Sequence, residues 1–333
     1  MAAGEGRRWG RSRKQEPERP EGEVLEGEVL EGVVLGPDGQ PADTSTGDRT
    51  DGDAADQGVP ERRDAAPEPL RVEVFTGPES AFFATSSLVY GPTEAVLVDT
   101  QLTLAAGREL AEWVAGKARR LTAVVITHPH PDHYFGTEEV LRLFPGTPVY
   151  AVPEVIAGVI ATALAKVAQW QPVFGDDLTS SPVVPGPLPP HRLRVDGAEL
   201  DVLAFGQGDC GACSVVHVPA ADTVVAGDLV YNGTHLWTAE TTPQERADWV
   251  ANLATLRGLG ASRVVAGHRA PGHGDGADRV IGFTAAYLRA FDARLARHPD
   301  DASALVEAMN ETYAELTLPV LLELSAEAAT RPR

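Results

Sequence analysis

Residues 127–133 read Thr127-His128-Pro129-His130-Pro131-Asp132-His133, which places three imidazoles and one carboxylate within six residues. The β-branched run at 123–126 precedes this cluster and is typical of a buried strand. Apolar residues at helical spacing follow it between Gly136 and Phe144. The cluster is therefore predicted on the turn between a strand and a helix. Neutral imidazole nitrogens beside a carboxylate suit zinc or a neighbouring first-row metal.

Three further apolar runs are each followed, within two residues, by an Asp or a His that could bind a metal. The runs at 95–98, 223–226 and 263–266 are followed by Asp99, Asp228 and His268, respectively. In an α/β sheet the strand ends collect ligands, because the apolar run anchors the scaffold and the next residues emerge at its edge. We therefore expect these side chains to join the histidine cluster.

The motif His128-x-His130-x-Asp132-His133 resembles the signature of metallo-β-lactamase-fold hydrolases, and the resemblance covers about residues 70 to 300. It implies an α/β protein built as an αββα four-layer sandwich, with one or two divalent metal ions at one edge of the paired sheets. Residue by residue, it implies that one metal binds His128 and His130, that a second binds Asp132, His133 and His268, and that Asp228 bridges the two. Asp99 would hold the cluster loop through hydrogen bonds.

The resemblance also implies the chemistry. A metal-bound hydroxide would attack the acyl carbonyl of a thioester, lactone, lactam or similar compound, with Asp132 and Asp228 as the catalytic carboxylates. Zinc is the first choice of metal, and iron or manganese are the alternatives. Tyr231, Asn232 and His235 follow the bridging residue and are candidates for substrate contact or, equally, for turn and packing roles.

One departure from the family pattern concerns the first metal. Family members carry a Gly-His pair after the strand predicted at 200–205, whereas this chain has Gly206-Gln207. Gln207 is a weak donor, and the thiolate of Cys210 is the substitute to consider, ahead of His217 inside the next strand. A two-metal site, a single-metal site and a degenerate site therefore remain open.

Other functions compete with hydrolysis. Some relatives on this fold bind iron and handle sulfur compounds or oxygen, although the flavin-linked di-iron members carry Glu where this chain has His130. A catalytically degenerate metal-binding protein is the third alternative.

The spacing Cys210-Gly211-Ala212-Cys213 occurs in thiol oxidoreductases and zinc knuckles. Here it precedes a predicted strand and no second such pair exists, so a coincidental spacing is favoured over a redox or zinc site.

The chain divides into three parts by composition. Residues 1–68 are rich in charged residues, Gly and Pro, and are predicted to form a disordered acidic tail that carries a Gly-Glu-Val-Leu-Glu repeat at 22–31. Residues 69–298 form the predicted domain, and 299–333 a helical extension packed on it. Within the domain, a helix at 155–170 and a Pro- and Gly-rich loop to Pro190 are expected to cover the site or to anchor a small core through Trp170 and Phe174.

The charge and composition of the chain limit the classes of partner and the location that can be expected. The 333 residues carry a formal charge of −20, which disfavours nucleic acid and anionic membranes and leaves a small-molecule substrate. The 2 cysteines agree with a reducing compartment, and no apolar run approaches a membrane span, so a cytoplasmic location is expected. The oligomeric state stays open.

Overall fold

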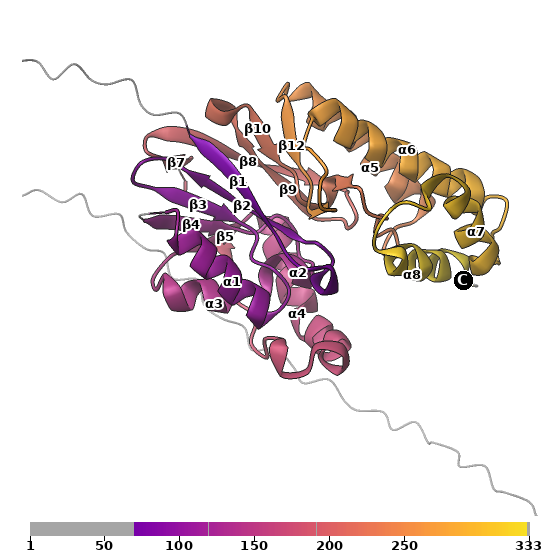
Figure 1. Cartoon of the computed structure of the whole chain (residues 1–333), viewed down its shortest axis with the longest axis horizontal. Helices are drawn as coiled ribbons and strands as arrows, with labels where there is room; N and C mark the ends of the chain where they lie inside the picture. The colour runs from indigo at the N-terminus through magenta and orange to yellow at the C-terminus, as the bar shows by residue number, and fades with distance from the viewer. Residues whose placement is uncertain (1–69, 119, 191, 332–333) are drawn as a thin grey trace, which may run out of the picture. The chain divides into compact units, whose positions relative to one another are not determined.

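The computed structural model describes residues 70–118, 120–190 and 192–331. The predicted disordered tail and its repeat lie outside these residues. In the described part, two β-sheets pack face to face, and helices cover the outer side of each sheet (Figure 1). The predicted αββα sandwich is therefore confirmed.

The first sheet has strand order β1-β2-β3-β4-β5-β6. Its antiparallel strands are β1 (Arg71–Thr76), β2 (Thr85–Tyr90) and β3 (Ala95–Val98), and parallel pairing joins β3 to β4 (Leu121–Val125), β5 (Val149–Ala151) and β6 (Gly186–Pro187). Side chains alternate between the two faces of a strand, so Leu97 faces the helices while Val96 and Val98 face the second sheet. Burial on both faces explains why this strand reads as a continuous apolar run.

The second sheet has strand order β12-β10-β9-β8-β7. Its strands are β7 (Leu193–Val195), β8 (Ala198–Gly206), β9 (Cys213–Val218), β10 (Thr223–Val225) and β12 (Arg263–Val265). A short parallel pair, β11 (Tyr231–Asn232) and β13 (His268–Arg269), lies beside the end of this sheet. Val216, Val218 and Val225 of this sheet share one buried cluster with valines of the first, which forms the interior of the sandwich.

The helices divide between the two outer layers. The first sheet carries α1 (Leu104–Ala115), α2 (Pro131–Tyr134), α3 (Thr137–Leu143) and α4 (Pro153–Phe174), and the second carries α5 (Pro243–Gly258), α6 (Ala277–Leu295), α7 (Ala302–Tyr313) and α8 (Pro319–Thr330). A capping box opens α5, because Thr242 Oγ1 accepts from the Glu245 amide and the Glu245 carboxylate accepts from the Thr242 amide. No helix within the described residues is long and apolar enough to span a membrane.

Helix α4 differs from its predicted extent. It continues past Trp170 to Phe174, with Pro172 in its last turn, and ends where Gly175 adopts a positive φ of 56°. Trp170 and Phe174 are therefore helical residues at the lower end of α4 (Figure 1), and the loop begins after them.

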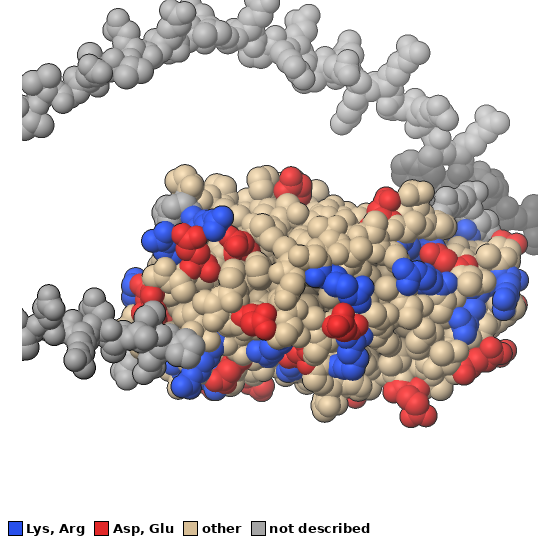
Figure 2. Space-filling model, turned by 90° about the horizontal axis from the view of Figure 1, so that it is seen from above, with Lys and Arg blue, Asp and Glu red and all other residues tan. Residues whose placement is uncertain are grey.

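Charged side chains are mixed on the surface. On the face shown in Figure 2, Lys and Arg side chains lie next to Asp and Glu side chains, separated by wide uncharged areas. Ion pairs such as Arg194–Glu199 at 2.7 Å also occur among the described residues.

Candidate metal centre

The predicted ligands come from strand ends, as expected. His128 and His130 lie in the loop after β4, Asp132 and His133 lie on α2, Asp228 follows β10 on a short 3-10 turn, and His268 opens β13. The turn after β10 forms because Gly227 adopts a positive φ of 50°. All six side chains converge at one edge of the sandwich.

Asp228 lies between the two halves of this cluster. The first half contains His128 and His130, and the second contains Asp132, His133 and His268. Its Oδ2 is 3.0 Å from His268 Nε2 and 3.8 Å from His128 Nε2, while its Oδ1 is 3.2 Å from His133 Nε2. Asp132 Oδ2 lies 3.3 Å from the same nitrogen of His268. The second half therefore has the donors that the sequence predicted.

The first half contains a donor that the sequence analysis missed. Asp209 Oδ2 lies 2.8 Å from His130 Nδ1, and its carboxylate is fully buried. His128, His130, Asp209 and Asp228 each offer one ligand atom, and these atoms lie within 4.8 Å of one another. A carboxylate thus stands where the family pattern predicted a histidine.

The loop after β8 explains why Asp209 reaches the cluster. The pairing of β8 with β9 shifts register between Ala204 and Gly206, and Gly206 has a positive φ of 75°. Gln207 turns its amide to the Gly208 carbonyl at 2.9 Å, and Cys210 Sγ lies 3.7 Å from Cys213 Sγ. The loop therefore directs the Asp209 carboxylate, and neither Gln207 nor Cys210, toward His128 and His130 as a candidate fourth donor.

Asp99 holds the histidine loop from behind. Its carboxylate accepts hydrogen bonds from the Thr127 amide at 2.9 Å, from Thr127 Oγ1 at 2.8 Å and from His133 Nδ1 at 2.9 Å. Asp99 adopts a positive φ of 62°, a conformation that Asp tolerates better than most residues. The bond to Nδ1 leaves His133 Nε2 free to face the cluster, as expected from the sequence.

Two other histidines are oriented in the same way. His268 Nδ1 donates to the Phe82 carbonyl at 2.6 Å, which directs Nε2 toward Asp132 and Asp228. His130 Nε2 lies 3.4 Å from Glu240 Oε2, so that Nδ1 faces the cluster, and Lys166 Nζ holds Glu240 at 2.5 Å. Glu240 and Lys166 stand in no motif, and nothing in the sequence marked them.

Buried atoms without partners test whether a metal fits. His128 Nε2, His133 Nε2 and Asp228 Oδ1 are buried, and none makes a well-oriented hydrogen bond within the described part of the chain, although His133 Nε2 and Asp228 Oδ1 lie 3.2 Å apart. Leaving such an atom unsatisfied costs about 1–3 kcal/mol. All three atoms point into the cluster, where a cation would satisfy them together, and the nitrogen and oxygen donors suit a divalent first-row ion.

The pKa shifts within the cluster also favour binding of a cation. Burial acts to lower the pKa of His268, but the larger combined effect of Asp228 and Asp132 raises this pKa to about 10. Burial raises the pKa of Asp209 to about 6, against the opposing effect of His130. Burial also acts to raise the pKa of Asp228, yet the surrounding imidazoles hold it well below its usual value. Carboxylates here are balanced by protons on imidazoles, and a bound cation would release those protons.

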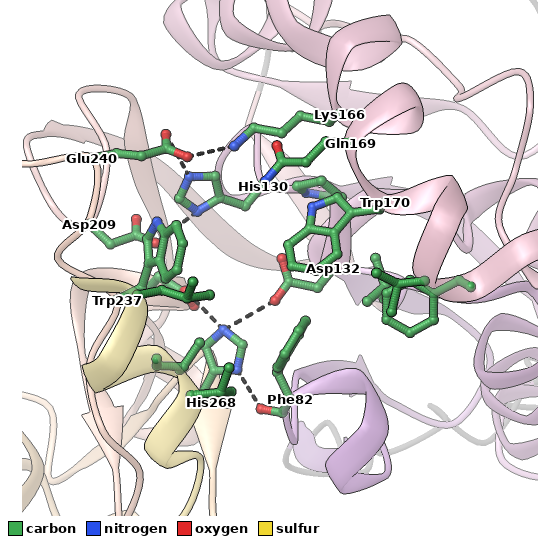
Figure 3. A pocket seen from close by; sticks show the side chains of 18 of the residues that line it. Phe82, His130, Asp132, Lys166, Gln169, Trp170, Asp209, Trp237, Glu240 and His268 are labelled. Carbon is green, nitrogen blue, oxygen red and sulfur yellow. Dashed lines mark hydrogen bonds and ion pairs between the residues drawn. The ribbon is translucent and has the colours of Figure 1, made fainter. Parts of the chain in front are cut away.

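A cavity of about 590 Å³ opens onto the cluster. His130, Asp132, Asp209 and His268 line it together with Phe82, Trp170 and Trp237 (Figure 3). Its volume is in the range of small-molecule sites.

Tyr231, Asn232 and His235 have separate places. Tyr231 borders the cavity, stacks on His268 with ring centroids 5.2 Å apart, and donates to Asp228 Oδ2 at 2.7 Å. Asn232 binds the Gly274 carbonyl, and His235 Nδ1 pairs with Tyr287 Oη at 2.9 Å. Neither Asn232 nor His235 is among the described residues lining the cavity, and their contacts favour the alternative of turn and packing roles.

The chain is similar in sequence to one protein family and in fold to solved structures of that family. A sequence model described as "Metallo-beta-lactamase superfamily" matches residues 80–268. A beta-lactamase domain protein from Burkholderia ambifaria has TM-score 0.55 and 17% identity, over 80% of this chain and 88% of its own. A metallo-beta-lactamase family protein from Thermus thermophilus has TM-score 0.54 and 22% identity, over 78% and 91%. No curated protein matches the chain.

Proposed function

Because the chain belongs to the metallo-β-lactamase superfamily, we propose that it is a metal-dependent hydrolase of a small acyl compound such as a thioester, lactone or lactam. Water would attack the acyl carbonyl, and the bond from the acyl carbon to sulfur, oxygen or nitrogen would break. One observation carries the proposal. Asp228 lies between two sets of imidazole and carboxylate donors, at the end of a cavity large enough for a small molecule.

The residues of the cluster divide into two sets of ligands. His128, His130 and Asp209 would hold one ion and Asp132, His133 and His268 a second, with Asp228 shared. One or two divalent ions, with zinc first and iron or manganese as alternatives, would acidify a water molecule and polarise the substrate carbonyl. The alternative of a degenerate site rests on Gln207, and the carboxylate of Asp209 in the same loop supports the hydrolase over this alternative.

Asp132 and Asp228 have different exposure, which suggests different roles. Both side chains line the cavity, but Asp132 is 14% exposed, whereas Asp228 is 2% exposed and accepts a hydrogen bond from Tyr231. Asp132 can therefore reach a water molecule next to the substrate, orient it and carry its proton. Asp228 is held in place by Tyr231 and would serve as the ligand that the two sets share.

The test combines metal content with turnover. Purified protein should contain zinc, iron or manganese and should hydrolyse members of a panel of thioesters, lactones and lactams. Asp132→Ala should abolish turnover, by a factor of about 10² or more, while Asp300→Ala, which removes an exposed carboxylate, should not. Undiminished turnover by metal-free protein would disprove the proposal.

A further inference from the structure

The walls of the cavity are aromatic and aliphatic. Phe82, Trp170 and Phe174 form a connected series, with ring centroids 5.7 Å apart between the first two and 5.9 Å between the last two. Trp237 lies across the cavity from Trp170 (Figure 3). Because these rings already pack on one another, a ligand can contact them with little further ordering.

The mouth of the cavity is apolar as well. Val173 at the end of α4 is 66% exposed, and Val320 and Leu324 on α8 are 38% and 37% exposed. All three line the cavity. An apolar surface therefore extends outward from the cluster of candidate metal ligands, between α4 and α8. An exposed apolar surface next to such a site is typical of ligand binding.

Within the described part of the chain, the cavity offers no free cation to an anionic group. Lys166 is the one Lys or Arg among the described residues that line it, and its ammonium group is 2.5 Å from Glu240. Asp132, Asp209 and Asp228 already offset much of the charge that bound metal ions would bring. A carboxylate or phosphate on the bound part of a substrate would lose its hydration here without gaining a partner.

From these three observations we propose that the substrate is an uncharged compound whose apolar acyl group lies between α4 and α8, with its carbonyl at Asp132 and His268. Substrates that bear a carboxylate beside the scissile bond are disfavoured. The proposal rests on the proposed hydrolase function, and it adds the chemical class of the substrate.

Aryl esters of graded acyl length test the proposal. We expect kcat/KM to rise about tenfold or more from the acetate to the octanoate, because each buried methylene adds to binding. An ester of the same length with a terminal carboxylate should be about tenfold poorer than the octanoate. Equal or higher kcat/KM for the acetate and the carboxylate ester would overturn the apolar assignment and leave the hydrolase function intact.

Matched variants locate the effect. Leu324→Glu places a charge at the mouth of the cavity and should remove the advantage of the octanoate. Leu143→Glu makes the same change at a residue that is 47% exposed on α3 and should retain the advantage. Thermal denaturation of both variants checks that they fold, and a Leu324→Glu variant that folds and keeps the full advantage would overturn the assignment.

Binding of non-hydrolysable amides separates this proposal from the reaction. Octanamide should bind the metal-loaded wild type in calorimetry more tightly than acetamide, and Leu324→Glu should weaken it. If octanamide binds in this way but no ester is hydrolysed, the apolar site is supported and the proposed reaction fails. Absence of both hydrolysis and binding overturns the apolar site.

Discussion

Asp209 completes the donors around His128 and His130, so metal content should depend on it. Asp209→Ala leaves that half with two imidazoles and Asp228, and we expect a loss of about one metal ion per chain. Gln207→Ala is the matched control from the same loop and should keep the wild-type metal content, because the Gln207 amide binds the Gly208 carbonyl. Elemental analysis of the dialysed proteins measures both. Loss of metal from Gln207→Ala but not from Asp209→Ala would reverse the assignment.

His235 should make stability depend on pH. Burial lowers the pKa of His235 to about 4, whereas a histidine in the unfolded chain has a pKa of about 6.5. Between about pH 6.5 and pH 4 the unfolded chain therefore binds the extra proton, and stability falls as the pH drops through this window. His235→Asn, which can keep a hydrogen bond to Tyr287, should reduce this loss by at most about 3 kcal/mol.

Urea denaturation of wild type and His235→Asn from pH 7 to pH 4 measures the difference. His298→Asn, three residues beyond the end of α6 and only partly buried, controls for the removal of one histidine. Parallel stability curves for wild type and His235→Asn would show that His235 does not contribute.

Single residues also mark the limit of what the sequence can predict at this site. His128, Asp132 and His268 were predictable because each belongs to a motif or ends an apolar strand. Asp209 lies in the loop where a ligand was expected, but the path of this loop follows the pairing of β8 with β9 and its register shift, which the local sequence does not specify. Asn232 and His235 look like site residues in sequence, and their actual partners, Gly274 and Tyr287, are distant along the chain.

At the scale of elements, the ends of β10 and β12 are packed closely enough to require glycine. The Gly267 amide donates to the Gly227 carbonyl at 2.8 Å. A Cβ at Gly267 would overlap Asp228 Oδ1 and would lie 2.7 Å from the Gly227 carbonyl carbon and 2.9 Å from the Asp228 amide nitrogen. Backbone atoms cannot move aside as a flexible side chain can.

Gly267→Ala should therefore displace Asp228 and reduce both metal content and stability, the latter by about 1–3 kcal/mol. Gly282→Ala is the control, because a Cβ at this position in α6 would meet no atom within 4 Å. It should be neutral or stabilising by up to about 1 kcal/mol, since alanine is the better helix former. Thermal denaturation with metal analysis tests the pair, and a Gly267→Ala variant with normal metal content would show that Asp228 can adjust.

Elements were more predictable than their ends. The apolar runs of β3, β4, β10 and β12 and the capping box of α5 are local signals, and the structure contains each of these elements. The end of α4 was not predictable, because Pro172 usually marks a boundary and is here accommodated in the last turn. Packing of Trp170 and Phe174 on the core of the first sheet favours the longer helix.

At the scale of the whole molecule, the C-terminal helices share the core of the second sheet. Leu305, Met309 and Leu322 belong to the same buried cluster as Trp249 of α5 and Phe291 of α6. Helix α8 also contributes Val320, Leu321 and Leu324 to the cavity. We therefore propose that residues 299–331, predicted as an extension packed on the domain, unfold together with it.

Leu322→Ala tests this cooperativity. Leu322 is 1% exposed, and its truncation should lower the free energy of unfolding by about 2–5 kcal/mol. Leu324→Ala, two residues along the same helix and 37% exposed, should change it by about 0.5 kcal/mol or less. If the helices and the domain form one unit, tryptophan fluorescence and far-ultraviolet circular dichroism will report coincident transitions for both variants. A loss of helical signal before the fluorescence change in Leu322→Ala would instead mean that α7 and α8 separate from a domain that remains folded.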